Sequence, residues 1–415
     1  MKKTIFAALL LALPALASAQ AMPEVTVLKA ARIFDGTSDT VKSNGVVVIQ
    51  AGRIQAAGSG IAVPVGASVI ELGDSTLLPG FIDAHVHLTG ESGDNWYEDT
   101  VNGMRQTVAE QAIRSTDYAR KTLMAGFTTV RNVGASDYID IGLRNSINAG
   151  IVPGPRMLVA AYSLGARGGH CDNTGFPYNF FGSESGIAQG IASGADLIKV
   201  CATGGVLSLS DAVDTPQLTQ AEMDALVDEA HRLGKKTAAH AHGAEGAKVA
   251  IRAGIDSIEH GSFLDDEALS MMKAKGTYYV PTVMAVEFTG RRPRNYPPEI
   301  AAKAKAAAAS HSTALKKAIQ MGVKIALGTD SAVSPHGLNA QEFGLLVAHG
   351  MAPAAALRAG TQVDSVLLGL DKLVGTLESG KAADVVAVPG NPLTDIRVTE
   401  KVNFVMKGGT VYKRP

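Results

Sequence analysis

The His85-Val86-His87 pair is the part of the sequence that most directly suggests chemistry. Two histidines at positions i and i+2 of an extended strand point to the same side of that strand. Imidazole nitrogen is a common ligand of zinc and of related divalent ions. The apolar run that comes before the pair, residues 78–84, is typical of a buried strand. The sequence therefore predicts two metal ligands at the carboxyl end of a core strand.

Further potential ligands follow other predicted strands. We expect eight strands, at residues 77–87, 128–133, 156–162, 197–202, 237–242, 257–260, 278–282 and 324–329. The fourth carries Lys199 in an apolar run, the fifth ends at His240 and His242, the sixth ends at His260, and Asp330 follows the eighth. The carboxyl ends of parallel barrel strands meet on one face, where barrel enzymes hold their active sites. These side chains are therefore expected to gather at one site.

The order of the elements predicts an α/β fold. The eight strands alternate with helical stretches such as residues 221–233 and 300–321, which favours a parallel sheet. Eight such units in about 290 residues fit a (β/α)8 TIM barrel, whose usual length is ~250 residues. The alternative is an open doubly wound sheet, but no Gly-x-Gly-x-x-Gly turn follows the first strand, which argues against a dinucleotide-binding fold.

Both ends of the chain have a different character from the middle. Short β-rich runs at 25–28, 45–49, 67–70, 384–388 and 402–406 are separated by Gly and Asp. We expect a small β-sandwich domain formed by both termini, from residues 22–76 and 375–415. The barrel is expected over residues 77–374.

The first 21 residues have the pattern of a secretory signal peptide. Lys2 and Lys3 precede an apolar stretch that ends at Leu16, and an Ala17-Ser18-Ala19 cleavage site follows. The alternative is a membrane anchor, but the stretch is too short to span a bilayer comfortably. We expect cleavage after Ala19 or Ala21 and a protein that is exported, periplasmic or secreted. No membrane association is expected after cleavage.

Charge and cysteine content limit the possible partners. Removing Lys2 and Lys3 from the 38 basic residues leaves 36 against 39 acidic ones, a net charge of −3, which excludes a large basic surface for nucleic acid. An oxidising compartment allows a disulfide between Cys171 and Cys201. Because Cys201 lies on a predicted core strand, where buried thiols are common, we favour two free thiols.

The set of strand-end residues resembles the amidohydrolase superfamily, in particular its imidazolonepropionase-like and prolidase-like branch. The likeness covers nearly all of the chain after the leader. It rests on the run Pro79-Gly80-Phe81-Ile82-Asp83-Ala84-His85-Val86-His87, Lys199, His240, Ile258-Glu259-His260-Gly261, Gly328-Thr329-Asp330-Ser331 and the closing segment 374–384.

This resemblance implies two divalent metal ions, usually Zn²⁺, although manganese also suits nitrogen and oxygen ligands. His85 and His87 would hold one ion with Asp330, and His240 and His260 would hold the second. Lys199, carboxylated by carbon dioxide, would bridge both. A free ammonium group has no lone pair and cannot ligate, so the modification makes chemical sense. The alternative is a buried Lys199 paired with Asp196 or with Asp330.

The resemblance also implies a reaction. A metal-bridging hydroxide would attack an amide carbonyl, and Asp330 would pass the proton to the leaving nitrogen. Relatives act on dipeptides and N-acyl amino acids, and some hydrolyse ochratoxin A to release phenylalanine; many are homo-oligomers. The first alternative is a cyclic-amide hydrolase of the imidazolonepropionase type. The second is a non-catalytic periplasmic binding protein, which would not need the proton shuttle at Asp330.

Five residues are candidates for contact with a small-molecule or dipeptide substrate. They are His170, His242, His336, Tyr162 and Arg131. His170, in a Gly-rich loop, is also a catalytic candidate that would polarise the substrate carbonyl, and a structural loop histidine is the equal alternative. Arg131 would suit a substrate carboxylate, and a salt bridge that orients a loop is its alternative.

Overall fold

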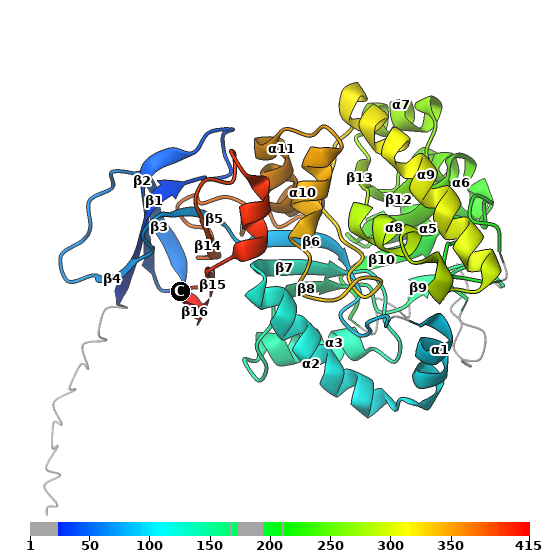
Figure 1. Ribbon diagram of the computed structural model, residues 1–415, viewed down its shortest axis with the longest axis horizontal. Helices are drawn as coiled ribbons and strands as arrows, with labels where there is room; N and C mark the ends of the chain where they lie inside the picture. The colour runs from blue at the N-terminus through cyan, green and yellow to red at the C-terminus, as the bar shows by residue number, and fades with distance from the viewer. Residues whose placement is uncertain (1–23, 94, 167, 173–193, 210) are drawn as a thin grey trace, which may run out of the picture.

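The computed structural model describes residues 24–93, 95–166, 168–172, 194–209 and 211–415. The predicted signal peptide lies outside the described residues. A β-rich domain lies beside a larger barrel domain, and the carboxyl terminus ends in the β-rich domain (Figure 1). None of the helices in the described part of the chain combines the length and the hydropathy needed to cross a bilayer.

The sequence predicts a β-rich domain formed by both termini, and strands from both ends of the chain do share one eight-stranded sheet. Its order is β16-β15-β14-β5-β1-β2-β3, and β4 pairs with β1. The strands are β1 (Val25–Ile33), β2 (Lys42–Gln50), β3 (Arg53–Ser59), β4 (Ser68–Glu71), β5 (Ser75–Pro79), β14 (Val385–Pro389), β15 (Phe404–Lys407) and β16 (Thr410–Lys413). Leu28 and Leu77 from the first half pack in one apolar cluster with Phe404 from the second. Burial of this shared cluster holds the two chain ends together.

The remaining strands form the barrel. They are β6 (Phe81–Val86), β7 (Phe127–Asn132), β8 (Arg156–Val159), β9 (Ser163–Leu164), β10 (Leu197–Cys201), β11 (Lys236–Gly243), β12 (Ser257–Phe263) and β13 (Tyr278–Val280). They run parallel in two sheets, β6-β7-β8 and β13-β12-β11-β10-β9. Backbone hydrogen bonds join the sheets at both seams. Asp196 N–H donates to the Val159 carbonyl on one side, and residues 324–327 bond to Tyr279 and to Ala84 on the other.

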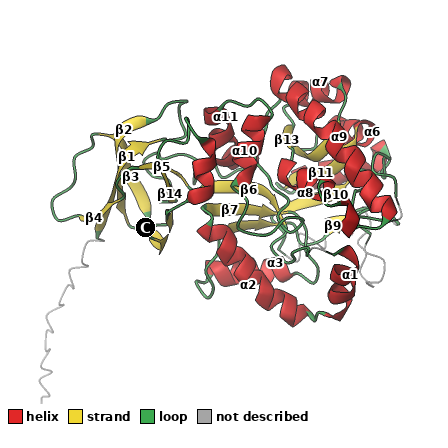
Figure 2. Ribbon diagram, viewed as in Figure 1, coloured by secondary structure: helices red, strands yellow, loops and turns green. Residues whose placement is uncertain are grey.

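Helices lie around the strands (Figure 2). They are α1 (Trp96–Arg105), α2 (Val108–Met124), α3 (Ile139–Asn148), α5 (Gln220–Arg232), α6 (Ala244–Ala253), α7 (Asp266–Lys275), α8 (Val283–Gly290), α9 (Pro298–Met321), α10 (Gln341–Ala348), α11 (Pro353–Arg358) and α12 (Asp364–Leu367). α5 and α9 match the two helices predicted at 221–233 and 300–321. A capping box between Thr219 and Glu222 fixes the start of α5.

Three strand predictions need correction. The first, 77–87, is two strands, because the chain leaves the β-rich sheet after β5 and starts the barrel at β6. The third, 156–162, stops at Val159, since Ala161 has a φ of 59° that interrupts an extended strand. The eighth, 324–329, is an extended segment with isolated bridges at Ile325 and Ser331 rather than a regular strand.

Candidate active site

A cavity of about 190 Å³ lies at the carboxyl ends of the barrel strands. It brings together eight of the polar residues singled out from the sequence: His85, His87, His170, Lys199, His240, His242, His260 and Asp330. The rest of the lining is mostly apolar, and it includes Val206, Leu207, Ala285, Val286 and Val333. The cavity is therefore lined partly by potential ligands and partly by these apolar residues, which are called its apolar wall.

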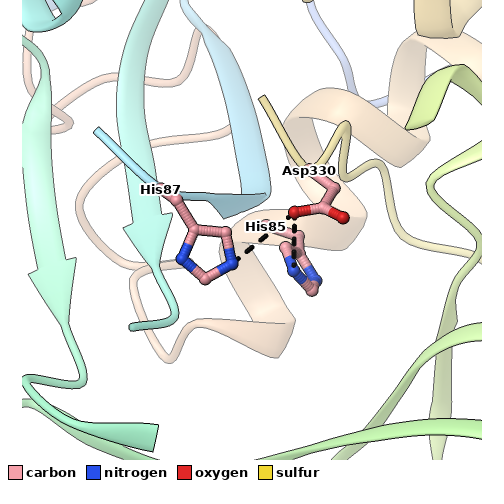
Figure 3. Close-up of side chains that lie close together, drawn as sticks. All are labelled: His85, His87 and Asp330. Atoms are coloured by element: carbon pink, nitrogen blue, oxygen red, sulfur yellow. Dashed lines mark ion pairs between the residues drawn. The ribbon is translucent and has the colours of Figure 1, made fainter. Parts of the chain in front are cut away.

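His85, His87 and Asp330 form the tightest group in the cavity (Figure 3). The Nε2 atoms of both histidines lie 3.5 Å from Oδ1 of Asp330, and one ligand atom from each of the three residues falls within 4.8 Å of the other two. Zinc–nitrogen bonds of about 2.0–2.1 Å in a tetrahedral site separate neighbouring ligand atoms by about 3.3 Å. The observed spacing therefore fits a single ion held by the three side chains.

Asp83 aligns the two chain segments that carry this group. Its buried carboxylate accepts hydrogen bonds from the backbone N–H of Thr329 at 3.1 Å, from the Thr329 hydroxyl at 2.7 Å and from Asn339 Nδ2 at 2.8 Å. Burial raises the pKa of Asp83 to about 6, although these hydrogen bonds act in the opposite direction. Asp83 thus connects β6, which carries His85, to the segment that carries Asp330.

Two of the expected ligands have unusual backbone conformations. His260 has a φ of 70° and Asp330 a φ of 56°, in the left-handed region that residues other than glycine rarely adopt. Such a conformation costs about 1–3 kcal/mol and persists where the surrounding structure enforces it, often at functional sites. Both residues are held in place at the rim of the barrel where the cavity opens.

Hydrogen bonds behind the histidine rings select the nitrogen that faces the cavity. Nδ1 of His85 lies 2.7 Å from Oε2 of Glu259, and Nδ1 of His87 lies 3.0 Å from the Gly134 carbonyl oxygen. Since both partners are acceptors, each Nδ1 carries the proton and donates it. Each Nε2 then keeps its lone pair and faces Asp330, which is the arrangement typical of metal-ligating histidines.

His240 and His260 lie next to this group. Their ring centroids are 4.6 Å apart, and the His260 ring is 4.9 Å from that of His85. Nε2 of His240 donates to the Gly204 carbonyl at 3.1 Å, and Nδ1 of His260 lies 2.8 Å from the Thr282 hydroxyl. Burial lowers the pKa of both rings well below the usual value. Both are therefore neutral at pH 7, which is the form that binds metal.

Lys199 extends from β10 into the same cavity and is only 3 % exposed. Among the residues that the structure describes, none forms a hydrogen bond or ion pair with its Nζ. Asp196, one suggested partner, instead accepts from Arg144 Nη1 at 2.7 Å. Burial lowers the pKa of Lys199 to about 8. A substantial neutral fraction at pH 7–8 favours reaction with carbon dioxide, because only the neutral amine is a nucleophile.

Two of the five substrate candidates line the cavity. The ring of His170 lies 4.3 Å from that of His240, and its Nδ1 is 3.0 Å from the Ser208 hydroxyl. His242 stacks on His260 at 5.0 Å. Tyr162 lines an adjoining cavity that shares His170, and its hydroxyl accepts the Asp137 N–H at 2.9 Å. These three residues are within or beside the space that a substrate would fill.

The other two candidates do not line the cavity. Arg131 is buried, and its guanidinium is paired with Glu259 of β12, so it forms a salt bridge between two strands rather than contacting a substrate carboxylate. His336 stacks on Tyr118 at 4.7 Å, and its Nε2 donates to the Gly90 carbonyl at 2.7 Å. With these contacts, His336 is not among the residues that line the cavity.

The prediction of two free thiols is wrong. Cys171 and Cys201 form a disulfide, with their Cα atoms 5.9 Å apart. Cys201 is the last residue of β10, and the loop that contains His170 folds back over that strand end. The disulfide joins this loop to the strand that carries Lys199. It therefore fixes the residue next to His170 at the edge of the cavity.

Replacing both cysteines by serine is expected to loosen this loop. We expect kcat/KM to fall by about 10-fold, because a misplaced active-site residue is costly even when the chemistry is intact. Closure of a 30-residue loop corresponds to at most about 3–4 kcal/mol of folding free energy, so the midpoint of thermal unfolding should also drop. Steady-state kinetics and thermal melts of the variant, beside reduced wild type, measure both. Unchanged kcat/KM would contradict the positioning role.

The roles of several residues of the site are not evident from the sequence alone. Glu259 belongs to the Ile258-Glu259-His260-Gly261 run that carries the family resemblance, but nothing in the sequence shows that its carboxylate contacts His85. The apolar residues of the lining, Ala285 and Val286 of α8 among them, have no residue type that marks a function. Their place beside the ligand group becomes evident only in the folded structure.

Comparison with known proteins agrees with this geometry. The model of the amidohydrolase family matches residues 76–412. Ochratoxinase from Aspergillus niger is 32% identical over 94% of this chain and 87% of its own, and its crystal structure superposes with a TM-score of 0.84. A crystal structure of a Xaa-Pro dipeptidase with methionine bound in its active site has a TM-score of 0.86 and 38% identity, over 94% of this chain and all of the other. The chain belongs to the amidohydrolase family and is a hydrolase of amide bonds.

Proposed function

We propose that this enzyme releases the carboxyl-terminal amino acid from a dipeptide or an N-acyl amino acid, with two divalent metal ions, expected to be Zn²⁺. The observation that carries the proposal is the cavity itself, which brings a group of imidazoles, Asp330 and the buried Lys199 together with a mostly apolar remaining lining. The prolidase-like and ochratoxinase relatives support the same reaction class.

The donor set fits two ions. His85, His87 and Asp330 would hold one, His240 and His260 the other, and Lys199 in its carboxylated form would bridge them. When bound, the metal pair would polarise the scissile carbonyl and lower the pKa of an attacking water molecule. The buried nitrogen atoms, each fixed by a hydrogen bond on its far side, are already oriented for ligation.

Asp330 would move the proton. Burial by itself raises the pKa of its carboxyl, but the nearby His85, His87 and Lys199 outweigh burial and lower this pKa below the ordinary value. The carboxylate is therefore ionised at pH 7. An ionised carboxylate beside the reacting atoms can take a proton from the attacking water and deliver it to the leaving nitrogen. That delivery is necessary for an amide, whose amine leaves only when protonated.

His170 and the apolar wall would choose the substrate. Burial lowers the pKa of His170 to about 4, so its ring is neutral and can donate a hydrogen bond to the substrate carbonyl. Val206, Leu207 and Val286 offer an uncharged surface to the side chain of the leaving residue. The methionine bound in the active site of the related dipeptidase supports an apolar leaving residue.

A panel of substrates tests the proposal. Zinc-loaded protein would be incubated with dipeptides, N-acyl amino acids and ochratoxin A, and free amino acids would be measured. We expect release of methionine, leucine or phenylalanine at least ~10-fold faster than release of aspartate or lysine, since a charged side chain would lose its hydration in the apolar cavity. Failure on every carboxyl-terminal amide, together with opening of a cyclic amide, would replace the proposal with the imidazolonepropionase-type alternative.

We also propose that the enzyme works outside the cytoplasm. The signal-peptide pattern of residues 1–21 supports export. The pairing of Cys171 with Cys201 agrees with an oxidising compartment. Loss of the leader from protein recovered from the periplasm or medium, detected by intact mass, tests this location.

A further inference from the structure

A continuous chain of buried polar groups runs from Arg131 through Glu259 to His85. Arg131 Nη2 donates to Oε1 of Glu259 at 2.9 Å, and His85 Nδ1 donates to Oε2 of the same carboxylate at 2.7 Å. The exposed fractions of the side chains are 2 % for Arg131, 0 % for Glu259 and 1 % for His85. Each oxygen of the carboxylate thus has its own charged or polar donor.

Further contacts hold the far end of this chain. Arg131 Nε donates to the Ala84 carbonyl at 2.5 Å, and Nη1 donates to the Ser257 hydroxyl at 3.1 Å. The Ser257 hydroxyl in turn donates to Glu259 Oε1 at 2.5 Å. The guanidinium therefore ties β6, one residue before His85, to β12, where Glu259 lies. Among the side chains, only the planar guanidinium of arginine offers this many N–H donors.

Two buried charges at this position need an explanation. Replacement of a buried ion pair by apolar residues is often neutral or stabilising, so stability alone does not account for it. Among the contacts that an apolar replacement would remove, the carboxylate acceptor behind the His85 ring is the one that reaches a predicted metal ligand. That acceptor fixes the proton on Nδ1 and leaves the Nε2 lone pair facing Asp330.

We propose that Glu259 and Arg131 form a positioning pair for His85: Glu259 sets the orientation and tautomer of the ring, and Arg131 fixes Glu259. Neither residue lines the cavity, so neither touches the substrate. The pair reaches the ligand group through the hydrogen bond between Glu259 and His85. The inference rests on the proposed function only in taking His85 as a metal ligand.

Glu259→Gln tests the pair with almost no change in volume. A glutamine can satisfy Arg131 with its oxygen, but its amide nitrogen then donates to His85 Nδ1 and forces the ring proton onto Nε2. We expect the dissociation constant for zinc, measured by competition with a chromophoric chelator, to rise about 10–100-fold. Arg131→Lys keeps the positive charge but loses the planar guanidinium. We expect it to raise the dissociation constant for zinc by about 10-fold, the lower end of the range expected for Glu259→Gln.

Asp384→Asn is the matched control. It breaks a different ion pair, between Arg156 of β8 and Asp384 just before β14, in which Arg156 Nη1 donates to Asp384 at 2.8 Å, and neither partner lines the cavity. This variant should bind zinc within about twofold of the wild type, a difference below 0.5 kcal/mol, although its unfolding temperature should fall. The comparison separates a positioning role from general loss of stability.

The outcomes are distinct. Weakened zinc binding in folded Glu259→Gln, with unchanged binding in Asp384→Asn, supports the pair. Binding within twofold of the wild type in folded Glu259→Gln overturns the pair and leaves the proposed function intact. If Glu259→Gln does not fold, the zinc affinity of Arg131→Lys decides between these two outcomes. A wild-type protein that binds no zinc would instead overturn the metal centre of the proposed function.

Discussion

Replacing Asp330 by asparagine is expected to lower kcat by about 10³-fold, within the 10²–10⁴-fold contribution of general acid–base catalysis. Asparagine keeps the volume of the side chain but cannot take up a proton at pH 7. Its amide is also a poorer partner than a carboxylate for a cation. Turnover of an N-acyl amino acid by zinc-loaded protein gives kcat, and zinc content and a thermal melt show whether the site and the fold persist.

Asp256→Asn is the control for this prediction. Asp256 lies just before β12, away from the cavity, and accepts hydrogen bonds from Lys236 and Thr237. The variant removes a carboxylate at the opposite end of the same barrel and should retain kcat within a few-fold. Near-wild-type kcat in Asp330→Asn would remove Asp330 from the catalytic role. A comparable loss in both variants would point to damaged folding instead.

Replacing Lys199 by alanine is expected to lower turnover by a similar factor of about 10³, corresponding to roughly 4 kcal/mol of lost metal-supplied stabilisation. The alanine variant leaves a gap between the two ligand groups where a small carboxylate can enter. Because formate or acetate supplies the two oxygens that a carbamate would supply, either should restore part of the activity. The measurement is kcat of Lys199→Ala against added carboxylate concentration.

Lys199→Arg is the control, because a guanidinium fills the gap with a group that has no acceptor. It should be inactive with or without added carboxylate. Near-wild-type turnover by Lys199→Ala would contradict a bridging role. If Lys199→Ala lost turnover that added carboxylate did not restore, and Lys199→Arg kept its turnover, the lysine would act as a cation rather than as a metal bridge.

The residues of the cavity are largely predictable because they obey local rules. His85 and His87 follow from the period of two in a strand, and His240, His260 and Asp330 follow from the rule that barrel strands present their carboxyl ends on one face. The β-rich domain is also predictable, since short β runs with Gly and Asp between them occur at both ends of the chain. Neither inference requires knowledge of which distant side chains contact one another.

The remaining features depend on contacts between distant segments. Arg131 is a candidate for substrate binding in the sequence because a strand-end arginine has the same pattern whether it faces the cavity or the core. Its real partner, Glu259, lies 128 residues further along the chain. The disulfide is not predictable for the same reason. The apolar strand around Cys201 indicates a buried position, but nothing in the sequence near Cys171 shows that its loop folds back onto that strand. His336 stacks on Tyr118, another distant contact, and does not line the cavity.

The most direct test of the central claim is removal and return of the metal. Purified protein would be dialysed against a chelator, assayed for release of methionine from an N-acyl methionine, and then reloaded with zinc at increasing molar ratio. A metal-dependent hydrolase with two ions should lose its turnover on dialysis and regain it as zinc approaches two equivalents per chain. Undiminished turnover in protein shown to be free of metal would contradict the account.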